Sequence, residues 1–174
     1  WPKYKYDTVY FGGGTPSLLE PSEIGRILKE IEITENAEIT LELNPATANL
    51  KKLKEFRENG INRLSIGIQS FNNEILKTLG RLHSAEKAKE TFYNARKAGF
   101  DNISIDLMFA VPNQGIEELK KDLETIKELN PEHISIYSLI WEEGTPFWDM
   151  LQKGLMKECD NEVESERFEL IIET

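Results

Sequence analysis

Three consecutive glycines, Gly12, Gly13 and Gly14, followed by Thr15, are the first residues whose types suggest chemistry. Glycine adds no side chain to a core, and a run of three costs backbone entropy. Such a loop exposes backbone N–H and C=O groups and lets a ligand approach them closely. It is neither a Walker A loop nor a G-x-G-x-x-G loop. Two interpretations remain: a tight turn, or a loop that binds the ammonium and carboxylate groups of an amino acid.

More polar side chains stand at or near the ends of short apolar runs. They are Glu42 before Asn44-Pro45, Gln69 after "RLSIGI", Asp106 within "ISIDLM", and the segment "WEEGTPF" after "HISIYS". Any one of them could cap a helix or a turn. In a parallel sheet, however, the carboxyl ends of the strands meet at one edge, where ligands bind. We therefore favour a shared ligand site there.

The apolar runs read as strands and the segments between them as helices. Strands are expected at residues 8–11, 38–43, 63–68, 103–108 and 133–138, each apolar enough to be buried on both faces. Apolar residues every three or four positions predict helices at residues 21–31, 50–60, 85–99 and 116–129, with another amphipathic pattern at 164–174. Gly60 and Gly99 suit helix C-termini, whereas Gly25 lies inside a helical pattern, where we expect a side chain to be tolerated.

The alternation of strand and helix, at roughly thirty residues per unit, predicts an α/β fold with a parallel sheet. A closed eight-stranded barrel takes about 250 residues. A chain of 174 residues with these strands is therefore an open sheet or most of a partial barrel.

Composition restricts the partners of the protein. The formal net charge of −10 makes nucleic acid an unexpected partner, and no apolar run approaches the roughly 18 residues of a membrane span. The single cysteine, Cys159, allows no intrachain disulfide and no cysteine-based metal cluster from this chain alone. It favours a reducing, cytoplasmic location. The sequence begins with Trp1 and not with an initiator Met, and the helical pattern at 164–174 ends without a cap. We therefore expect a fragment of a longer protein.

Several motifs, taken in order, resemble those of one family. "FGGGTPSLL", "ELNP", "GINRLSIGIQSF", "LGRLH", "IDLMFAVPNQ" and "LNPEHISIYSLIWEEGTPF" are similar to the oxygen-independent coproporphyrinogen III oxidase family of radical S-adenosylmethionine (SAM) proteins. "GGGTPS", "NP", "QS" and "LGRLH" look more like the haem-chaperone (HemW-type) branch. The coproporphyrinogen dehydrogenases tend to have "GGGTPT", "DP", "QD" and "NR" at these places.

The resemblance implies a partial (β/α)6 barrel. Residues 1–144 would hold strands 2 to 6, and residues 145–174 would begin a truncated C-terminal extension. A 4Fe-4S cluster and SAM would sit at the carboxyl rim of the strands. The cluster would be held by a CxxxCxxC loop after the first strand, which we expect upstream of Trp1.

The resemblance also implies cofactor contacts, residue by residue. They are Gly13, Gly14 and Thr15 at the methionine amino end, Glu42 on the ribose hydroxyls or the amino group, then Gln69, Arg81 and Asp106. An Arg fork suits a carboxylate, but Arg81 could also be a surface arginine at a helix end. Asp106 could be a capping or buried paired acid. Ala110 stands where the family usually has Gly, and its methyl would tighten the adenosine pocket or shift the loop.

Neither histidine is a clear ligand: His83 suits helix packing better than metal or haem ligation, and His133 suits a structural role. The resemblance assigns no catalytic residue. It implies a haem chaperone that binds haem, SAM and the cluster. The alternative is a dehydrogenase, an oxidoreductase that decarboxylates coproporphyrinogen through a 5′-deoxyadenosyl radical. Partners would be haem or porphyrinogen, an electron donor and, for a chaperone, a membrane-associated haem acceptor. A third hypothesis is an unrelated parallel-barrel binding domain.

Overall fold

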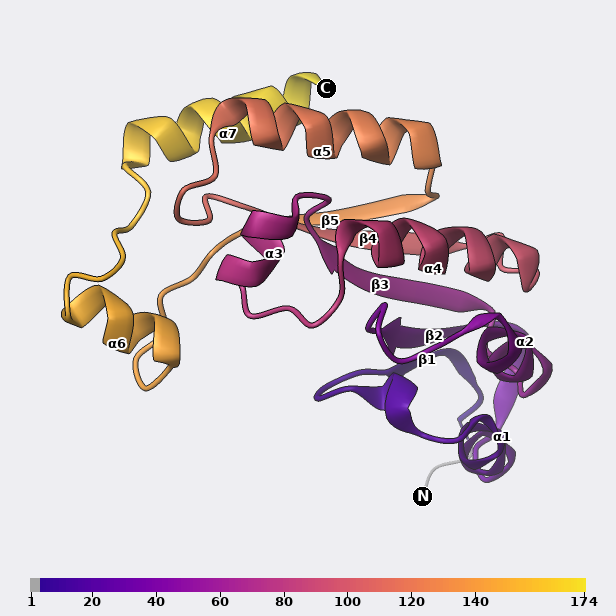
Figure 1. Cartoon of the computed structure of the whole chain (residues 1–174). Helices are drawn as coiled ribbons and strands as arrows, with labels where there is room; N and C mark the ends of the chain where they lie inside the picture. Colours follow the sequence, from indigo (N-terminus) through magenta and orange to yellow (C-terminus); the bar gives the residue numbers. More distant parts are fainter. Residues whose placement is uncertain (1–3) are drawn as a thin grey trace. The chain divides into compact units, whose positions relative to one another are not determined.

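The computed structural model describes residues 4–174 and contains a sheet flanked by helices (Figure 1). The strands are β1 (Tyr6–Phe11), β2 (Ile33–Leu43), β3 (Arg63–Gln69), β4 (Ile103–Phe109) and β5 (His133–Ser138). The helices are the short 3-10 turn η1 (Pro16–Leu18), then α1 (Pro21–Lys29), α2 (Leu50–Glu58), α3 (Asn73–Thr78), α4 (Ala85–Lys97), α5 (Ile116–Leu129), α6 (Pro146–Gln152) and α7 (Asn161–Glu173).

The strands lie side by side in sequence order, β1-β2-β3-β4-β5. β1 pairs parallel with β2, and β2 pairs parallel with β3, with Glu42 directly opposite Ser65. Each pair of neighbouring strands is joined by at least one helix. This is the strand–helix alternation that the sequence predicts, and all the predicted strands are present.

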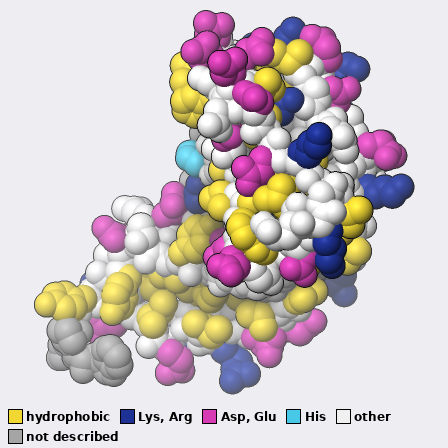
Figure 2. All heavy atoms as spheres, turned by 90° about the vertical axis from the view of Figure 1, so that its left-hand side faces the viewer, with side chains coloured by type: hydrophobic (Ala, Val, Ile, Leu, Met, Phe, Trp, Pro, Cys, Tyr) yellow, Lys and Arg dark blue, Asp and Glu magenta, His cyan; other side chains and the backbone are white. Residues whose placement is uncertain are grey.

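Burial differs between the centre and the edges of the sheet. Most residues of β3 and β4 are buried, as predicted. The same prediction is wrong for β1 and β5, whose residues are mostly exposed or half-buried. Within residues 4–174 these are the edge strands of the sheet, with a neighbouring strand on one side only. Tyr4, Tyr6 and Tyr10 are among the exposed aromatic residues, and hydrophobic side chains reach the surface between charged ones in Figure 2.

Apolar and polar side chains alternate along the inner strands. In β4, Ile103, Ile105 and Leu107 are fully buried, whereas Ser104 and Asp106 between them are polar. Successive side chains of a strand point to opposite faces. One face of the sheet therefore joins the apolar core, and the other carries polar groups.

The chain forms two compact units, each made of several segments. The first comprises Trp1–Ile68, Glu86–Asp106 and Pro131–Ser135, and the second Gln69–Ala85, Leu107–Asn130 and Ile136–Thr174. β3, β4 and β5 begin in the first unit and end in the second. The boundary expected from the sequence, between residues 144 and 145, stays a prediction.

In the first unit the apolar core includes Phe56 of α2 and Phe92 of α4, both fully buried. α1 begins with a capping box between Glu20 and Glu23. A Cβ atom at Gly25 would press on Oδ1 of Asn59 and lie 3.2 Å from its Cγ. A side chain at Gly25 would therefore require the Asn59 side chain at the end of α2 to shift, and the expectation that Gly25 tolerates one stays a prediction.

In the second unit α5 and α7 pack together, and Phe168 of α7 stacks on Phe109 with ring centroids 6.3 Å apart. Asp160 caps the start of α7 by accepting from the Glu162 N–H. The helix predicted at 164–174 is confirmed and begins three residues earlier. No helix within residues 4–174 is long and apolar enough to cross a membrane.

Candidate functional site

The glycine loop after β1 depends on backbone freedom. Gly13 and Gly14 have φ angles of 79° and 57°, in the left-handed region that favours glycine. A Cβ atom on either would meet nothing within 4 Å, so conformation and not crowding requires glycine there. At Gly12, by contrast, a Cβ atom would lie 2.6 Å from the Tyr10 ring. The loop is a tight turn with exposed backbone, and its contact with a ligand stays a prediction.

Glu42 of β2 holds this loop in place. Its Oε1 accepts from the Tyr10 hydroxyl at 2.9 Å, and its Oε2 accepts from the Gly13 N–H at 3.1 Å. Thr15, half-buried, ends the loop and accepts through its C=O from the Leu18 N–H at 3.0 Å. Gly13 and Glu42 lie 29 residues apart in sequence, and this hydrogen bond brings the predicted glycine loop and the predicted Glu42 contact together.

Asp106 of β4 continues the polar face. The Ser65 hydroxyl of β3 donates to Asp106 Oδ1 at 3.1 Å, and Ser65 lies opposite Glu42 in the sheet. Burial raises the pKa of Asp106 above its ordinary value of 3.8, and the nearby charge of Glu42 raises it further. Hydrogen bonds from Ser65 and Ser135 oppose that shift. Asp106 is thus a partly buried acid paired with hydroxyl groups, and not a helix cap.

Partial desolvation of its hydroxyl and the hydrogen bond to Glu42 raise the pKa of Tyr10, although the residue as a whole is exposed. Tyr10, Glu42, Ser65 and Asp106 therefore form one electrostatically coupled row across four strands. Within this row, the charge of Glu42 raises the pKa of both Tyr10 and Asp106.

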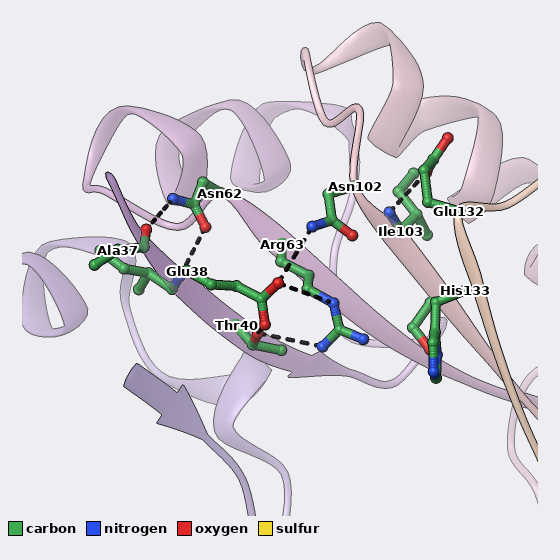
Figure 3. Close-up of polar contacts among 11 residues, drawn as sticks. Ala37, Glu38, Thr40, Asn62, Arg63, Asn102, Ile103, Glu132 and His133 are labelled. Atoms are coloured by element: carbon green, nitrogen blue, oxygen red, sulfur yellow. Dashed lines mark hydrogen bonds and ion pairs between the residues drawn. The ribbon is translucent and has the colours of Figure 1, made fainter. Parts of the chain in front are cut away.

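The polar face extends towards the amino ends of the strands (Figure 3). The Arg63 Nε lies 3.8 Å from Glu38 Oε2, and its Nη1 donates to Thr40 Oγ1 at 3.3 Å. Asn102 also donates to Glu38, at 3.4 Å. His133 Nδ1 lies 2.8 Å from the Ser104 hydroxyl, which agrees with its expected structural role. In this part of the polar face, the charges of Arg63 and Glu38 neutralise each other in an ion pair.

In the second unit, Gln69 ends β3 in an unusual conformation. It is buried and has a φ of 71°, rare for a residue with a long side chain. Its Oε1 accepts from the Tyr137 hydroxyl at 2.8 Å, and its Nε2 makes no hydrogen bond to residues 4–174. Ser70 and Phe71 follow it, and both donate to the buried Asp122 of α5 at 2.7 Å. The turn is fixed by these bonds while the Gln69 amide keeps a free donor.

Arg81 follows the end of α3. Gly80, with φ 66°, donates to the Lys77 C=O, and the Arg81 N–H donates to the Leu76 C=O at 2.9 Å. This Schellman motif fixes the backbone at Arg81. Its half-buried guanidinium makes no hydrogen bond or ion pair within residues 4–174. The helix-end interpretation is therefore right about its position, and its donors remain available to a ligand.

Two further predictions concern the packing role of His83 and the methyl group of Ala110. His83 is buried, in agreement with a packing role, and the described part of the chain holds no group of three or more His, Cys, Asp or Glu that suits a metal ion. Ala110 is buried with φ 56°, so it adopts the backbone conformation that glycine would. Whether its methyl group tightens the adenosine pocket or shifts the loop stays a prediction.

The structure thus joins Gly13, Glu42 and Asp106 in the first unit, with Gly14 and Thr15 in the same loop, and places Gln69 and Arg81 in the second. Sequence reasoning missed Tyr10, Ser65 and Tyr137. The alternation of polar and apolar residues in the strands was the signal that could have found Ser65.

The donors and acceptors present suit SAM. Glu42 offers carboxylate oxygens with spare lone pairs beside exposed backbone at Gly13 and Gly14, which matches an ammonium and hydroxyl groups. The Arg81 guanidinium suits a carboxylate. Each unit thus presents groups that suit a part of SAM, and their joint contact with one SAM molecule stays a prediction.

Comparison with known proteins gives the family. Residues 1–126 match the family model described as "Radical SAM superfamily". The chain is 36% identical over 170 residues to "Heme chaperone HemW" of Bacillus subtilis, covering 95% of this chain and 45% of that protein. It is 40% identical over 167 residues to "Heme chaperone HemW" of Haemophilus influenzae, covering 86% and 44%. The chain thus spans less than half the length of these relatives.

A solved structure shows the same fold. Coproporphyrinogen III oxidase (HemN) from Escherichia coli, described as a radical SAM enzyme, superposes with a TM-score of 0.83 at 28% identity, over 95% of this chain and 39% of that chain. The fold is α/β, with the parallel strands of the partial radical SAM barrel. Proteins of this family use SAM and a 4Fe-4S cluster. The chain belongs to the radical SAM superfamily.

Proposed function

We propose that the full-length protein is a haem chaperone that binds haem, SAM and a 4Fe-4S cluster. The observation that carries this proposal is the similarity over 95% of the chain to a protein named as a haem chaperone. The motifs "GGGTPS", "NP", "QS" and "LGRLH" support the same branch.

The proposed SAM contacts are Gly13, Gly14, Thr15, Glu42, Gln69, Arg81 and Asp106. Glu42 supports its own assignment, because it already holds the Gly13 N–H and keeps further acceptor capacity. The free guanidinium of Arg81 suits the methionine carboxylate. Asp106, with its raised pKa, would keep a proton to higher pH than an ordinary aspartate and would then donate a hydrogen bond.

The cluster ligands are proposed to come from outside this sequence. The only cysteine, Cys159, lies between α6 and α7, whereas the family's cluster loop precedes the strand that corresponds to β1. β1 is an edge strand in the described part of the chain, so its outer edge can pair with a preceding strand. On this proposal residues 1–144 are strands 2 to 6 of the barrel, and residues 145–174 begin a C-terminal extension.

The proposed partners are haem, an electron donor for the cluster and a membrane-associated haem acceptor, and the proposed location is the cytoplasm. The second candidate function is oxidative decarboxylation of coproporphyrinogen III. The similarity to the structure of coproporphyrinogen III oxidase from E. coli favours it.

The experiment uses full-length protein with a reconstituted cluster, supplied in parallel with haem or with coproporphyrinogen III, SAM and a reductant. A chaperone takes up haem, seen in the Soret band, and transfers it to an apo-haemoprotein without forming protoporphyrinogen. Formation of protoporphyrinogen with release of carbon dioxide would establish the dehydrogenase. Neither haem uptake nor decarboxylation would refute both functions.

A further inference from the structure

A cavity of about 430 Å³ lies within the second unit, and none of its lining residues is among those assigned to SAM. It is formed by the loop between β4 and α5, by the segment between α6 and α7, and by Arg167 of α7. Its volume is within the range of sites for small organic molecules, about 300–1,000 Å³.

Among the lining residues, Arg167 is unusual because it is a charged side chain that is buried. It is only 8% exposed. Its Nη2 donates to the Gln114 C=O, its Nη1 lies 3.4 Å from the Cys159 Sγ, and its Nε has no hydrogen-bond partner. No carboxylate forms an ion pair with it within residues 4–174. A carbonyl and a thiol satisfy some of its donors, but neither neutralises its charge.

A buried charge is costly unless an opposite charge compensates it. Glu158 also lines the cavity but is exposed and forms no ion pair with Arg167. The other cation of the wall is Lys157. Lys157 and Glu158 offset each other in the wall, so its excess positive charge is the buried Arg167 guanidinium, which keeps a spare donor.

The remaining wall joins the polar residues Asn113 and Gln114 to an apolar part, made of Val111, Pro112, Leu155 and Met156. A fully hydrated inorganic ion would make poor use of such a surface. A molecule with an apolar part and one anionic end would bury the first against these side chains and pair the second with Arg167.

We propose that this cavity binds a small organic anion, an alkyl carboxylate or phosphate monoester, whose charge is neutralised by Arg167. Its lining shares no residue with the SAM contacts, and the proposal does not depend on the haem chaperone function. Planar forked donors make Arg a good partner for either anion.

Three probes test the proposal on the full-length protein: hexanoate, hexyl phosphate and uncharged hexan-1-ol, each followed by isothermal titration calorimetry. A local readout is the rate of Cys159 alkylation by iodoacetamide, measured by peptide mass spectrometry, because the half-buried Cys159 lines the same cavity. We expect at least one anion to bind and to slow this alkylation, and hexan-1-ol to do neither. The better anion identifies the carboxylate or the phosphate source.

Arg167→Met keeps the length of the side chain and removes its charge, and should weaken anion binding about 10- to 100-fold, since a charged hydrogen bond is lost. Arg167→Lys keeps the charge and serves if the Met variant does not fold; it should bind more weakly than the parent because it lacks the fork. Lys153→Met removes an exposed cation outside the cavity and should change nothing. Absence of anion binding, equal binding of hexan-1-ol, or unchanged affinity in the Arg167 variants would overturn the proposal.

Discussion

The two units hold their predicted site residues in different ways. In the first, Glu42 accepts from Tyr10 and Gly13, and Asp106 accepts from Ser65, so the polar groups are already bonded to one another. In the second, Arg81 and the Nε2 of Gln69 have no partner within residues 4–174. The first unit has a framework that shapes the loop, and the second has donors ready for a ligand.

Variants in the two units should therefore behave differently. Removing a group from a bonded framework disturbs both the local structure and ligand binding. Removing a donor with no protein partner disturbs binding alone. Backbone strain follows a similar division, because in the second unit non-glycine residues, Gln69 and Ala110, adopt positive φ angles.

The largest effect is expected for Gly13→Val. A β-branched side chain at φ 79° costs about 1–3 kcal/mol of strain and blocks the approach to the loop backbone, so SAM affinity should fall more than about 100-fold. Gly99→Val is the matched control. Gly99 also has a positive φ and open space around its Cα, but it precedes the amino end of β4, whereas Gly13 follows the carboxyl end of β1. Both variants should lose similar thermal stability. If Gly13→Val binds SAM as well as Gly99→Val, the glycines serve only the turn.

Arg81→Ala should weaken SAM binding by about 10- to 100-fold, the loss of a charged hydrogen bond of roughly 1.5–3 kcal/mol. Its unfolding temperature should match that of the parent, because the side chain has no protein partner and the Schellman motif uses only the backbone at this position. Lys77→Ala removes an exposed cation of α3, the helix before Arg81, as a control. A loss of stability as large as the loss of affinity would show that Arg81 is structural.

The next effect concerns pH and Asp106. Its raised pKa means that the folded protein holds a proton that the unfolded chain releases near pH 4, so this group's contribution to stability falls as pH rises through the folded pKa. Asp106→Asn has no carboxyl group to titrate, so its stability should not fall in this way. Above the folded pKa of Asp106, the variant should be more stable than the parent. Urea unfolding across the pH range measures the difference. Glu117→Gln is a control of opposite sign, since a hydrogen bond from Lys120 lowers the pKa of Glu117. Parallel profiles for parent and Asp106→Asn would contradict the raised pKa.

The smallest effect is expected for Ala110→Gly. Relief of left-handed strain, about 1 kcal/mol, nearly cancels the loss of a buried methyl group, about 0.8 kcal/mol. Ala95→Gly removes an equally buried methyl from α4 without relieving strain, so it should be clearly destabilising. Equal losses of stability at both positions would mean that Ala110 is not strained.

The comparison also shows what sequence patterns can predict. The strands, the longer helices and the position of the glycine loop follow from local periodicity and glycine placement, and all are confirmed. The exposure of β1 and β5 depends on which strands lie at the edges, and crowding at Gly25 depends on Asn59, 34 residues away. Short helices such as α3 and α6 carry too few residues for a clear period. Partners such as Tyr10 and Ser65 depend on register between strands, which no single segment contains.

The most direct test of the account is a titration of SAM into full-length, cluster-loaded protein carrying Glu42→Gln. A glutamine amide has one acceptor oxygen where the carboxylate accepts from both Tyr10 and Gly13, so its NH2 group would face a donor. We predict an affinity about 10- to 100-fold below that of the parent, together with a lower unfolding temperature. Glu35→Gln, an exposed position earlier in β2, should leave both unchanged. SAM affinity in Glu42→Gln equal to that of the parent would contradict the assignment of the Glu42-held glycine loop as the cofactor site.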